Sequence, residues 1–297
     1  MSSGSTLPRR ALGRRLRDLR LAAKKSQLAA AVTIEISKQG VGRMEDGEPV
    51  RVCTAQFREL LQFYGADEAA CTEVLGLLQE ARAAKGDPAN GWWRAYSDVV
   101  NPHFDHFMGL EQASSRMTTF QLTLLPGLLQ TPAYRRWIMQ TTEPNISEVD
   151  RERHLELIAR RQRRLVEDPD FSLDLLLSES ALRHQVGGRT VMSGELRHLL
   201  DVEEMPNVSV RVVPFSVGAY PGLVVQSFTL FDFPLLRASR LSEPPVVFVE
   251  GYTGALFLED ERMVQRYKGA VADLRRVALS EKDTRLLVRQ IAEEYAS

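Results

Sequence analysis

The feature that most constrains this chain is SQLAAAVTIEISKQGVGRMEDG, residues 26–47. Ser26 and Ser37 each suit a helix N-cap, where a side-chain oxygen accepts a hydrogen bond from a backbone N–H of the first turn. Ala30 and Ala31 are small, so that a second helix can cross the first closely and at a steep angle. The stretch therefore predicts two short helices joined by a turn.

The second of these helices has two distinct sides. On a helical wheel Val41 and Met44 share one side with Ser37 and are expected to face the core. Glutamine can form a paired hydrogen bond to adenine, and arginine or lysine suits guanine or phosphate. Gln27 opens the first helix, where backbone N–H groups and a side-chain amide can hold a phosphate. The residues predicted to contact DNA are Arg17, Gln27, Ser37, Lys38, Gln39, Gly42 and Arg43.

The predicted recognition helix contains two glycines, Gly40 and Gly42. Each costs roughly 1 kcal/mol of helix stability relative to alanine. Gly42 removes one base-reading side chain but lets the backbone approach the duplex, whereas Gly40 flanks the buried side. We expect a working DNA reader whose discrimination rests chiefly on Gln39. The alternative is a helix-turn-helix that is kept only to bind protein.

The net charge of −1 conceals an asymmetry along the chain. Residues 1–43 hold ten lysines and arginines against only Asp18 and Glu35, a local balance of +8, so the remainder carries about −9. A basic terminus on an acidic body indicates a phosphate-binding module joined to a separate regulatory domain. A charged tail that only aids solubility is the alternative.

The pattern of apolar residues predicts an α+β protein. Residues 1–84 are expected to form an all-helical helix-turn-helix domain, residues 85–91 a linker, and residues 92–297 a mixed α+β domain. In the second domain, the predicted helices cover residues 93–107, 132–139, 147–167, 260–278 and 280–295. The predicted strands cover residues 171–180, 207–215, 223–233 and 245–260, and Gly254 is expected to mark a turn between two short strands in the last range.

Composition and motifs exclude several classes of protein. The two cysteines have no metal-ligand or C-x-x-C spacing, and no run of about 18 apolar residues is present, so we expect a cytoplasmic protein without membrane contact, associated with the nucleoid when bound to DNA. The sequence has no G-x-S-x-G elbow, no phosphate loop and no H-E-x-x-H motif. We therefore expect no enzyme activity, no catalytic residues, no resident metal and no cofactor.

Two parts of the chain resemble known families. The "SQ", "S-x-x-x-V" and "R-x-E-x-G" patterns over about residues 10–64 resemble the Xre-type repressors, which implies a lambda-repressor-like domain. In those proteins glycine usually occupies the turn position of Glu35, so a left-handed backbone there would cost about 1–2 kcal/mol. The segments LLPGLLQTPAYRRWIMQ, ALRHQVGG, MPNVSVRVVPFSVGAYPG and TGALFLED resemble the actinobacterial WhiJ-like regulators over nearly the whole chain. The resemblance implies a transcriptional regulator, often encoded beside a small partner protein in a toxin–antitoxin-like pair.

Some features of the second domain leave two readings open. The segment NPHFDHFMGLE contains His103, Asp105, His106 and Glu111, and is read as an amphipathic helix rather than as a metal site. The segment ARRQRRL, residues 159–165, is read as a salt-bridged helix face, with a second phosphate-binding patch as the alternative. An aromatic cluster and the loop PFSVGAYPG are either ordinary core and connection or a surface for a partner or ligand. The residues predicted for that surface are Trp92, Trp93, Tyr96 and Tyr220.

These observations predict a homodimeric, sequence-specific transcriptional regulator that binds double-stranded operator DNA, including its own promoter region. Two half-sites a helical turn apart would supply the specificity that one short helix lacks. Its second domain is expected to sense a partner or small ligand and to mediate dimerisation. The alternative function is an antitoxin-like protein whose main act is to bind a small co-encoded partner.

Overall fold

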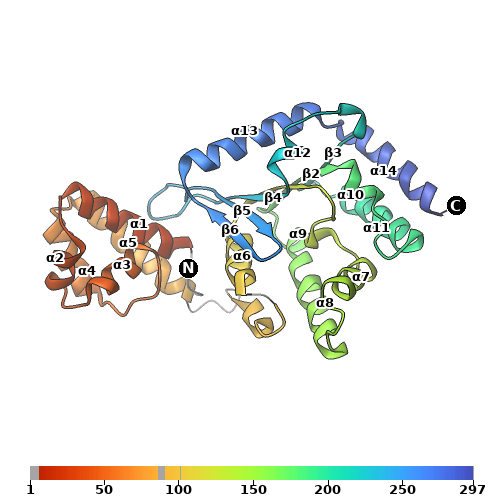
Figure 1. Ribbon diagram of the computed structural model, residues 1–297. Helices are drawn as coiled ribbons and strands as arrows, with labels where there is room; N and C mark the ends of the chain where they lie inside the picture. The colour runs from red at the N-terminus through yellow and green to blue at the C-terminus, as the bar shows by residue number, and fades with distance from the viewer. Residues whose placement is uncertain (1–6, 86–90, 101, 297) are drawn as a thin grey trace. The chain divides into compact units, whose positions relative to one another are not determined.

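The computed structural model describes residues 7–85, 91–100 and 102–296, which divide into two compact units (Figure 1). The first unit comprises Met1–Arg94, Phe104–Ala113 and Phe233–Glu243. The second comprises Ala95–His103, Ser114–Asp232 and Pro244–Ser297. The predicted fold class, a helical N-terminal part followed by a mixed α+β domain, is confirmed.

The first unit is a bundle of short helices around one apolar core. Its helices are α1 Leu7–Ala22, α2 Gln27–Thr33, α3 Lys38–Glu45, α4 Thr54–Tyr64 and α5 Glu68–Lys85. The 3-10 helix η1 Trp92–Tyr96 and the helix α6 Pro102–Ala113 each belong partly to this unit and partly to the second. Leu12 and Leu16 recur one turn apart on α1 and are buried, as are Leu60 and Leu61 on α4 and Val74 on α5. The apolar spacing along the sequence thus places one face of each helix in the core.

The first unit also contains a segment from late in the chain, residues 233–243. Leu236 is 6% exposed and belongs to the same core as the α1–α5 side chains. Ala238 donates its backbone N–H to Glu80 Oε1 at 2.8 Å, and a Cβ at Gly76 would lie only 2.9 Å from the Ala238 methyl. Glu243 is buried and forms an ion pair with Arg14 of α1. The helical unit is therefore not one continuous stretch of chain.

The second unit is built on one six-stranded sheet in the order β3-β2-β1-β4-β5-β6 (Figure 1). The strands are β1 Arg116–Gln121, β2 Ser172–Ser178, β3 Val208–Val213, β4 Phe228–Asp232, β5 Val246–Gly251 and β6 Gly254–Leu258. The β1–β2 and β2–β3 pairs are parallel, and the remaining pairs are antiparallel. β2 is buried along almost its whole length, which explains its nearly continuous apolar sequence.

Helices cover the sheet and close one of its edges. The crossover from β1 to β2 carries η2 Gly127–Leu129, α7 Pro132–Thr142, α8 Glu148–Gln162 and α9 Arg164–Glu167, and that from β2 to β3 carries α10 Glu179–Arg183 and α11 Arg189–Val202. The short helices η3 Phe215–Val217 and α12 Gly222–Val225 precede β4, and α13 Glu261–Val277 and α14 Glu281–Ala296 end the chain. Leu279 N–H bonds Val212 O at 2.8 Å and Thr284 Oγ1 accepts from Val212 N–H at 3.0 Å, which protects the outer edge of β3.

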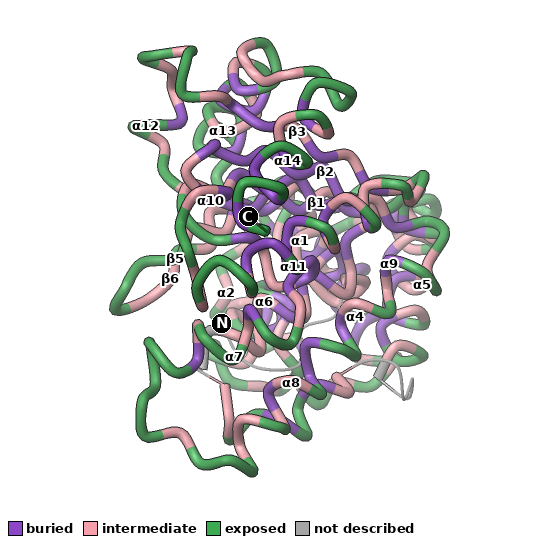
Figure 2. Tube along the Cα trace, turned by 90° about the vertical axis from the view of Figure 1, so that its right-hand side faces the viewer, coloured by how far each residue is buried: buried purple, intermediate pink, exposed green. Residues whose placement is uncertain are grey.

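Buried side chains concentrate where α13 packs on the sheet, and the trace in Figure 2 is buried along the central strands. Val271 and Leu274 of α13 belong to the same buried cluster as Phe120 and Phe228 of the sheet. None of the helices in the described part of the chain is long and apolar enough to cross a membrane.

Several predicted elements are wrong in extent. The helix predicted over residues 93–107 is instead η1 and α6, separated by residues 97–101. The strand predicted from residue 223 begins only at Phe228, because residues 222–225 form the short helix α12. β1, α10 and α11 were not predicted. Of the predicted linker, residues 86–90 lie outside the described residues.

The burial of Leu236 in the helical unit generates a test. We expect Leu236→Ala to lower the free energy of unfolding of that unit by about 2–4 kcal/mol, because the change leaves a cavity in its core. The matched control is the adjacent Leu235→Ala, since Leu235 is 68% exposed. Hydrogen exchange resolved to peptides of α1–α5 measures the effect. Equal exchange in the two variants would contradict the assignment of this loop to the helical core.

Candidate nucleic-acid interface

The helix-turn-helix is formed by α2 and α3, each held by the predicted N-cap. Ser26 Oγ accepts from Ala29 N–H at 3.0 Å, and Ser37 Oγ accepts from Gly40 N–H at 2.9 Å. Gly47 follows α3 with φ 71°, the left-handed exit expected for a glycine. The caps of both helices are therefore confirmed.

The turn between the helices is held from α4. Glu35 has φ 54°, so the side chain that replaces the usual glycine does stand in the left-handed region. Gln56 Nε2 donates to Ile34 O at 2.7 Å, while its Oε1 accepts from Cys53 N–H at 2.9 Å. One glutamine thus fastens the turn to the first turn of α4, and this contact was not predicted.

The backbone of α3 lies directly against α1. A Cβ at Gly13 of α1 would lie 2.5 Å from Met44 O and 2.7 Å from Glu45 O, distances that real side chains do not reach. Val41 is 0% and Met44 is 5% exposed, which confirms the predicted core side of α3. Gly13 therefore sets how closely the recognition helix approaches the first helix.

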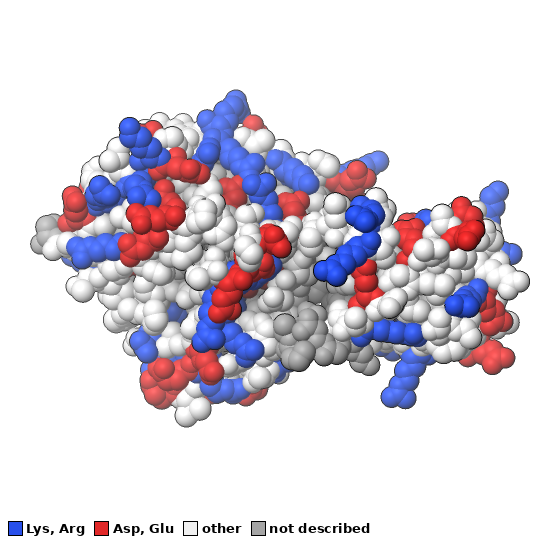
Figure 3. Space-filling model, turned by 180° about the vertical axis from the view of Figure 1, so that it is seen from behind, with Lys and Arg blue, Asp and Glu red and all other residues white. Residues whose placement is uncertain are grey.

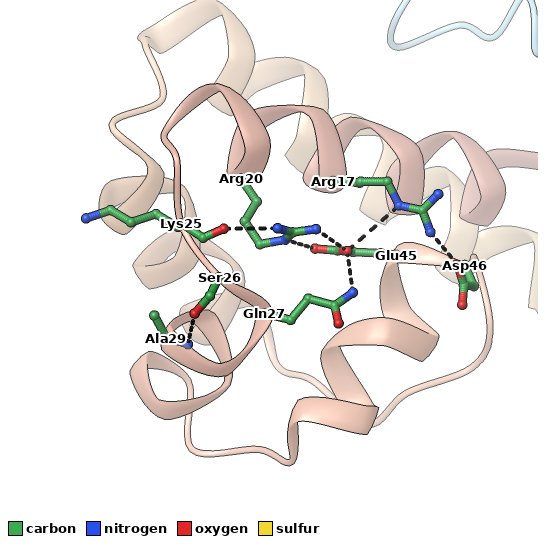
Figure 4. A network of polar contacts seen from close by, with 8 residues as sticks. All are labelled: Arg17, Arg20, Lys25, Ser26, Gln27, Ala29, Glu45 and Asp46. Carbon is green, nitrogen blue, oxygen red and sulfur yellow. Dashed lines mark hydrogen bonds and ion pairs between the residues drawn. The ribbon is translucent and has the colours of Figure 1, made fainter.

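A buried carboxylate joins the first three helices (Figure 4). Glu45 accepts from Arg20 Nε at 2.6 Å on Oε1 and from Arg20 Nη2 at 2.9 Å on Oε2. Gln27 Nε2 donates to the same Oε2 at 2.9 Å. Arg20 also donates to Lys25 O at 3.0 Å, and its hydrogen bond to Glu45 raises the pKa of the guanidinium. Arg20, Gln27 and Glu45 thus tie α1, α2 and α3 into one rigid body.

A signal for this network was present in the sequence. Arg20 continues the Leu12–Leu16 spacing of the apolar face of α1, and Glu45 continues the Val41 spacing on α3. A charge in the phase of a core face is expected to be paired. From the sequence, Glu45 had no predicted role beyond its place in the R-x-E-x-G pattern.

Three of the predicted DNA-contacting side chains extend from the free side of α3. Lys38, Gln39 and Arg43 are exposed, whereas Gly42 is half-buried. Arg43 Nε donates to Glu48 Oε2 at 2.9 Å and its Nη2 to Pro49 O at 3.2 Å. Exposed pairs of this kind contribute little, about 0–1 kcal/mol, so a phosphate or base can replace the carboxylate.

The remaining predicted contacts flank that face. Arg17 pairs with Asp46 and lies 3.8 Å from Glu45 Oε2. Gln27 is half-buried, and its amide keeps a second N–H after donating to Glu45. Ser37 is exposed, but its Oγ already accepts the hydrogen bond that caps α3. Contact of these residues with DNA stays a prediction.

The basic excess of the N-terminus is largely offset within its own unit. The unit holds seventeen lysines and arginines against fourteen aspartates and glutamates, so its formal charge is +3 rather than the +8 of residues 1–43. Arg14 and Arg15 are paired with Glu243 and Glu73. On the face drawn in Figure 3 basic and acidic side chains are interspersed. Net charge alone therefore provides only weak attraction to a phosphate backbone.

Comparison with protein families agrees with this geometry. Residues 11–84 match a helix-turn-helix domain, and residues 104–290 match a domain of unknown function, DUF5753. The second match spans more than half of the chain. The chain belongs to the DUF5753 family. No curated protein and no solved structure matches it, and the finer resemblance to WhiJ-like regulators stays a prediction.

The aromatic residues predicted to form a partner or ligand surface have different surroundings. In the first unit, Trp93 is 5% exposed and donates to Asp105 Oδ1 at 2.7 Å, while the half-buried Trp92 meets it edge-on. In the second unit, Tyr96 is buried beside the Arg153 guanidinium, and the half-buried Tyr220 packs edge-on against Phe120. Their role in binding a partner is not tested by these contacts.

The histidine-rich segment forms most of α6. Asp105 accepts from Trp93 and lies 3.6 Å from Arg94, and burial lowers the pKa of His106 to about 4. The side chain of His103 lies outside the described residues. Among the described residues no group of three metal-ligating side chains is found.

The ARRQRRL segment of the DUF5753 domain fits neither reading completely. Arg161 is 7% exposed, whereas Arg163 is exposed. Arg164 pairs with Asp168 at 3.0 Å and lies over the Phe171 ring at 3.9 Å. The segment therefore includes a buried cation as well as solvated and paired ones.

The two glycines of α3 have different surroundings, which generates a second test. A Cβ at Gly42 would meet only Gln27, at 3.8 Å, whereas one at Gly40 would lie 3.2 Å from Ser37 Oγ and 3.3 Å from Ile36 Cδ1. We expect Gly42→Ala to stabilise the helical unit by about 1 kcal/mol. Gly40→Ala should stabilise the unit much less, because the added methyl group crowds the Ser37 cap. Thermal or urea unfolding of the two variants checks this order, and a larger gain from Gly40→Ala would refute it.

Proposed function

We propose that this DUF5753 protein is a cytoplasmic, sequence-specific DNA-binding regulator of transcription. The observation that carries the proposal is that α3 has one buried side and one exposed side. Val41 and Met44 are buried, Glu45 is locked by Arg20, and Lys38, Gln39 and Arg43 extend outward from the held helix. Side chains on a rigid helix can be presented to base edges with little loss of conformational entropy on binding.

We assign different tasks to the exposed residues. Gln39 suits paired recognition of adenine, and Arg43 suits guanine after it leaves Glu48. Lys38 and Arg17 act on phosphates, as do the N-terminal regions of α2 and α3 through Gln27 and Ser37. Gly42 lets the recognition helix approach the duplex closely. Such an interface reads few bases, so we propose a homodimer that reads two half-sites.

The regulatory step is proposed to use the chain between β4 and β5. Phe233–Glu243 follows Asp232 of β4, and β5 begins three residues after it, yet this segment packs on the helices of the first unit. A ligand or partner that changes the ends of these strands would act on α1 and α5 through Arg14 and Glu80. Differential affinity for the two resulting states is then the source of regulation.

The first experiment is fluorescence-anisotropy binding to the DNA upstream of the protein's own gene, with a random duplex of equal length as the comparison. We expect wild type to prefer its own region, with affinity falling steeply between about 50 and 300 mM salt. Gln39→Ala should weaken binding to the preferred duplex about 10- to 100-fold, since a paired base contact is lost, and should leave random DNA unaffected.

The control variant is Gln62→Ala, which removes an exposed glutamine from α4. It should leave both affinities unchanged. If own and random DNA bind equally weakly and Gln39→Ala changes neither, base reading by α3 is refuted. The antitoxin-like function, with DNA binding secondary, would then be tested by co-purification with the co-encoded partner in the absence of DNA.

A further inference from the structure

The DUF5753 domain contains basic side chains on two helices that pack together, α7 and α8. His154, Ile158 and Arg161 recur at helical spacing on one face of α8, and all three are buried. Arg135 extends from α7, which packs against α8. A Cβ at Gly127 of η2 would lie 3.1 Å from Arg161 Nη1, so glycine there leaves room for the guanidinium.

Arg135 and His154 have no counter-ion. In the described part of the chain no carboxylate lies within 4.0 Å of either side chain, and neither Arg135 Nε nor His154 Nε2, both buried, has a hydrogen-bond partner. Burial, then the charge of Arg161, lowers the pKa of Arg135. Burial, then the charge of Arg135, lowers the pKa of His154. The charge of Arg161 thus acts on Arg135, and the charge of Arg135 acts on His154.

Arg136, the next residue in the sequence, has a carboxylate partner. It is exposed and lies 3.2 Å from Glu152 Oε1.

The carboxylates around Arg135 do not pair with it. Glu143 and Glu250 attract Arg135 only from beyond ion-pair distance. Glu195, which accepts from Thr131 N–H one turn before Arg135, is fully buried, and burial raises its pKa to about 7. Its carboxyl is therefore largely protonated below neutral pH and supplies little negative charge.

A bound anion would give Arg135 Nε and His154 Nε2, both buried, the hydrogen-bond partner that neither has in the described part of the chain. Guanidinium groups hold phosphate and carboxylate through paired hydrogen bonds, and a protonated imidazole adds another donor. Arg135 is only half-buried, so the cluster is not closed to solvent. We propose that the DUF5753 domain binds a small metabolite through a phosphate or carboxylate group held between Arg135 and His154. The role of this ligand as effector rests on the proposed regulatory function, but the site itself does not.

Isothermal titration of the full chain tests the site, with inorganic phosphate and acetate as separate probes against chloride at equal ionic strength. We expect one or both anions to bind wild type with measurable heat. Arg135→Gln should weaken that binding at least 10-fold, and Arg136→Gln should leave it unchanged. The stronger probe identifies whether the group is a phosphate or a carboxylate.

Proton uptake provides an independent readout. The groups that act on His154 are Arg135, the carboxylates of Glu143 and Asp150, and the backbone of Val99. An added anion offsets Arg135 and raises the pKa of His154 from its lowered value in the free protein. Binding near pH 6.5 should therefore take up part of a proton, and affinity should rise as the pH falls from 8 to 6. His154→Gln should abolish the uptake, as measured in buffers of different ionisation enthalpy.

The outcomes separate the site from the function. Equal binding by wild type and Arg135→Gln would show an adventitious ion only and overturn the proposal. No binding of either anion would also overturn it, and would mean that water is the partner of Arg135 Nε and His154 Nε2. DNA binding by Arg135→Gln is measured in parallel and should be retained, because Arg135 lies in the second unit. The preference of Gln39→Ala for its own DNA over random DNA tests base reading by α3. Its outcome does not bear on the anion site.

Discussion

The arrangement of the helix-turn-helix depends on one buried carboxylate. Glu45 ends α3, yet its two oxygens are held by Arg20 of α1 and Gln27 of α2. Removal of either charged partner would leave the other unpaired in the core, which is more unfavourable than the pair is favourable. The pair therefore contributes geometry more than stability. With Gly13 bringing α1 against the α3 backbone, it fixes the angle at which the recognition helix faces solvent.

The helical unit is also completed by chain from outside the helix-turn-helix. Leu236 fills part of its core, and Glu243 neutralises Arg14 from a position more than two hundred residues away in the sequence. This segment lies in the chain between β4 and β5, so the sheet and the helical unit are covalently connected there. In the proposed regulatory step, this connection is the route from the strands to the helices, so no long-range pathway through packed side chains is required.

Arginines illustrate how one residue type serves three physical purposes here. Arg20 is buried and fully partnered, so it positions helices. Arg17 and Arg43 form surface pairs that a competing phosphate can replace at little cost. Arg135 keeps its buried Nε without a hydrogen-bond partner, and we propose that it binds an anion. Composition cannot distinguish these cases, because each depends on what folding brings within about 4 Å.

The sequence by itself determined the helix-turn-helix, its caps and the buried and exposed sides of α3. These features depend on contacts within a few residues, such as Ser26 with Ala29 and Ser37 with Gly40. It also determined the mixed second domain, since β2 and β3 are apolar enough to be recognised alone. It did not reveal β1, whose RMTTFQ sequence becomes a central strand only through its neighbours β2 and β4.

Only the tertiary structure decided which charges pair, which glycine is required and where the helical unit ends. In the sequence Gly13 is one small residue among several. The structure shows that glycine is required there, because the carbonyls of Met44 and Glu45 lie against it. Leu235 and Leu236 are equivalent in the sequence, yet one is exposed and the other is core. The physical reason is common to all three cases. Local preference acts over a few residues, whereas close packing and charge pairing act between groups that the chain brings together only when it folds.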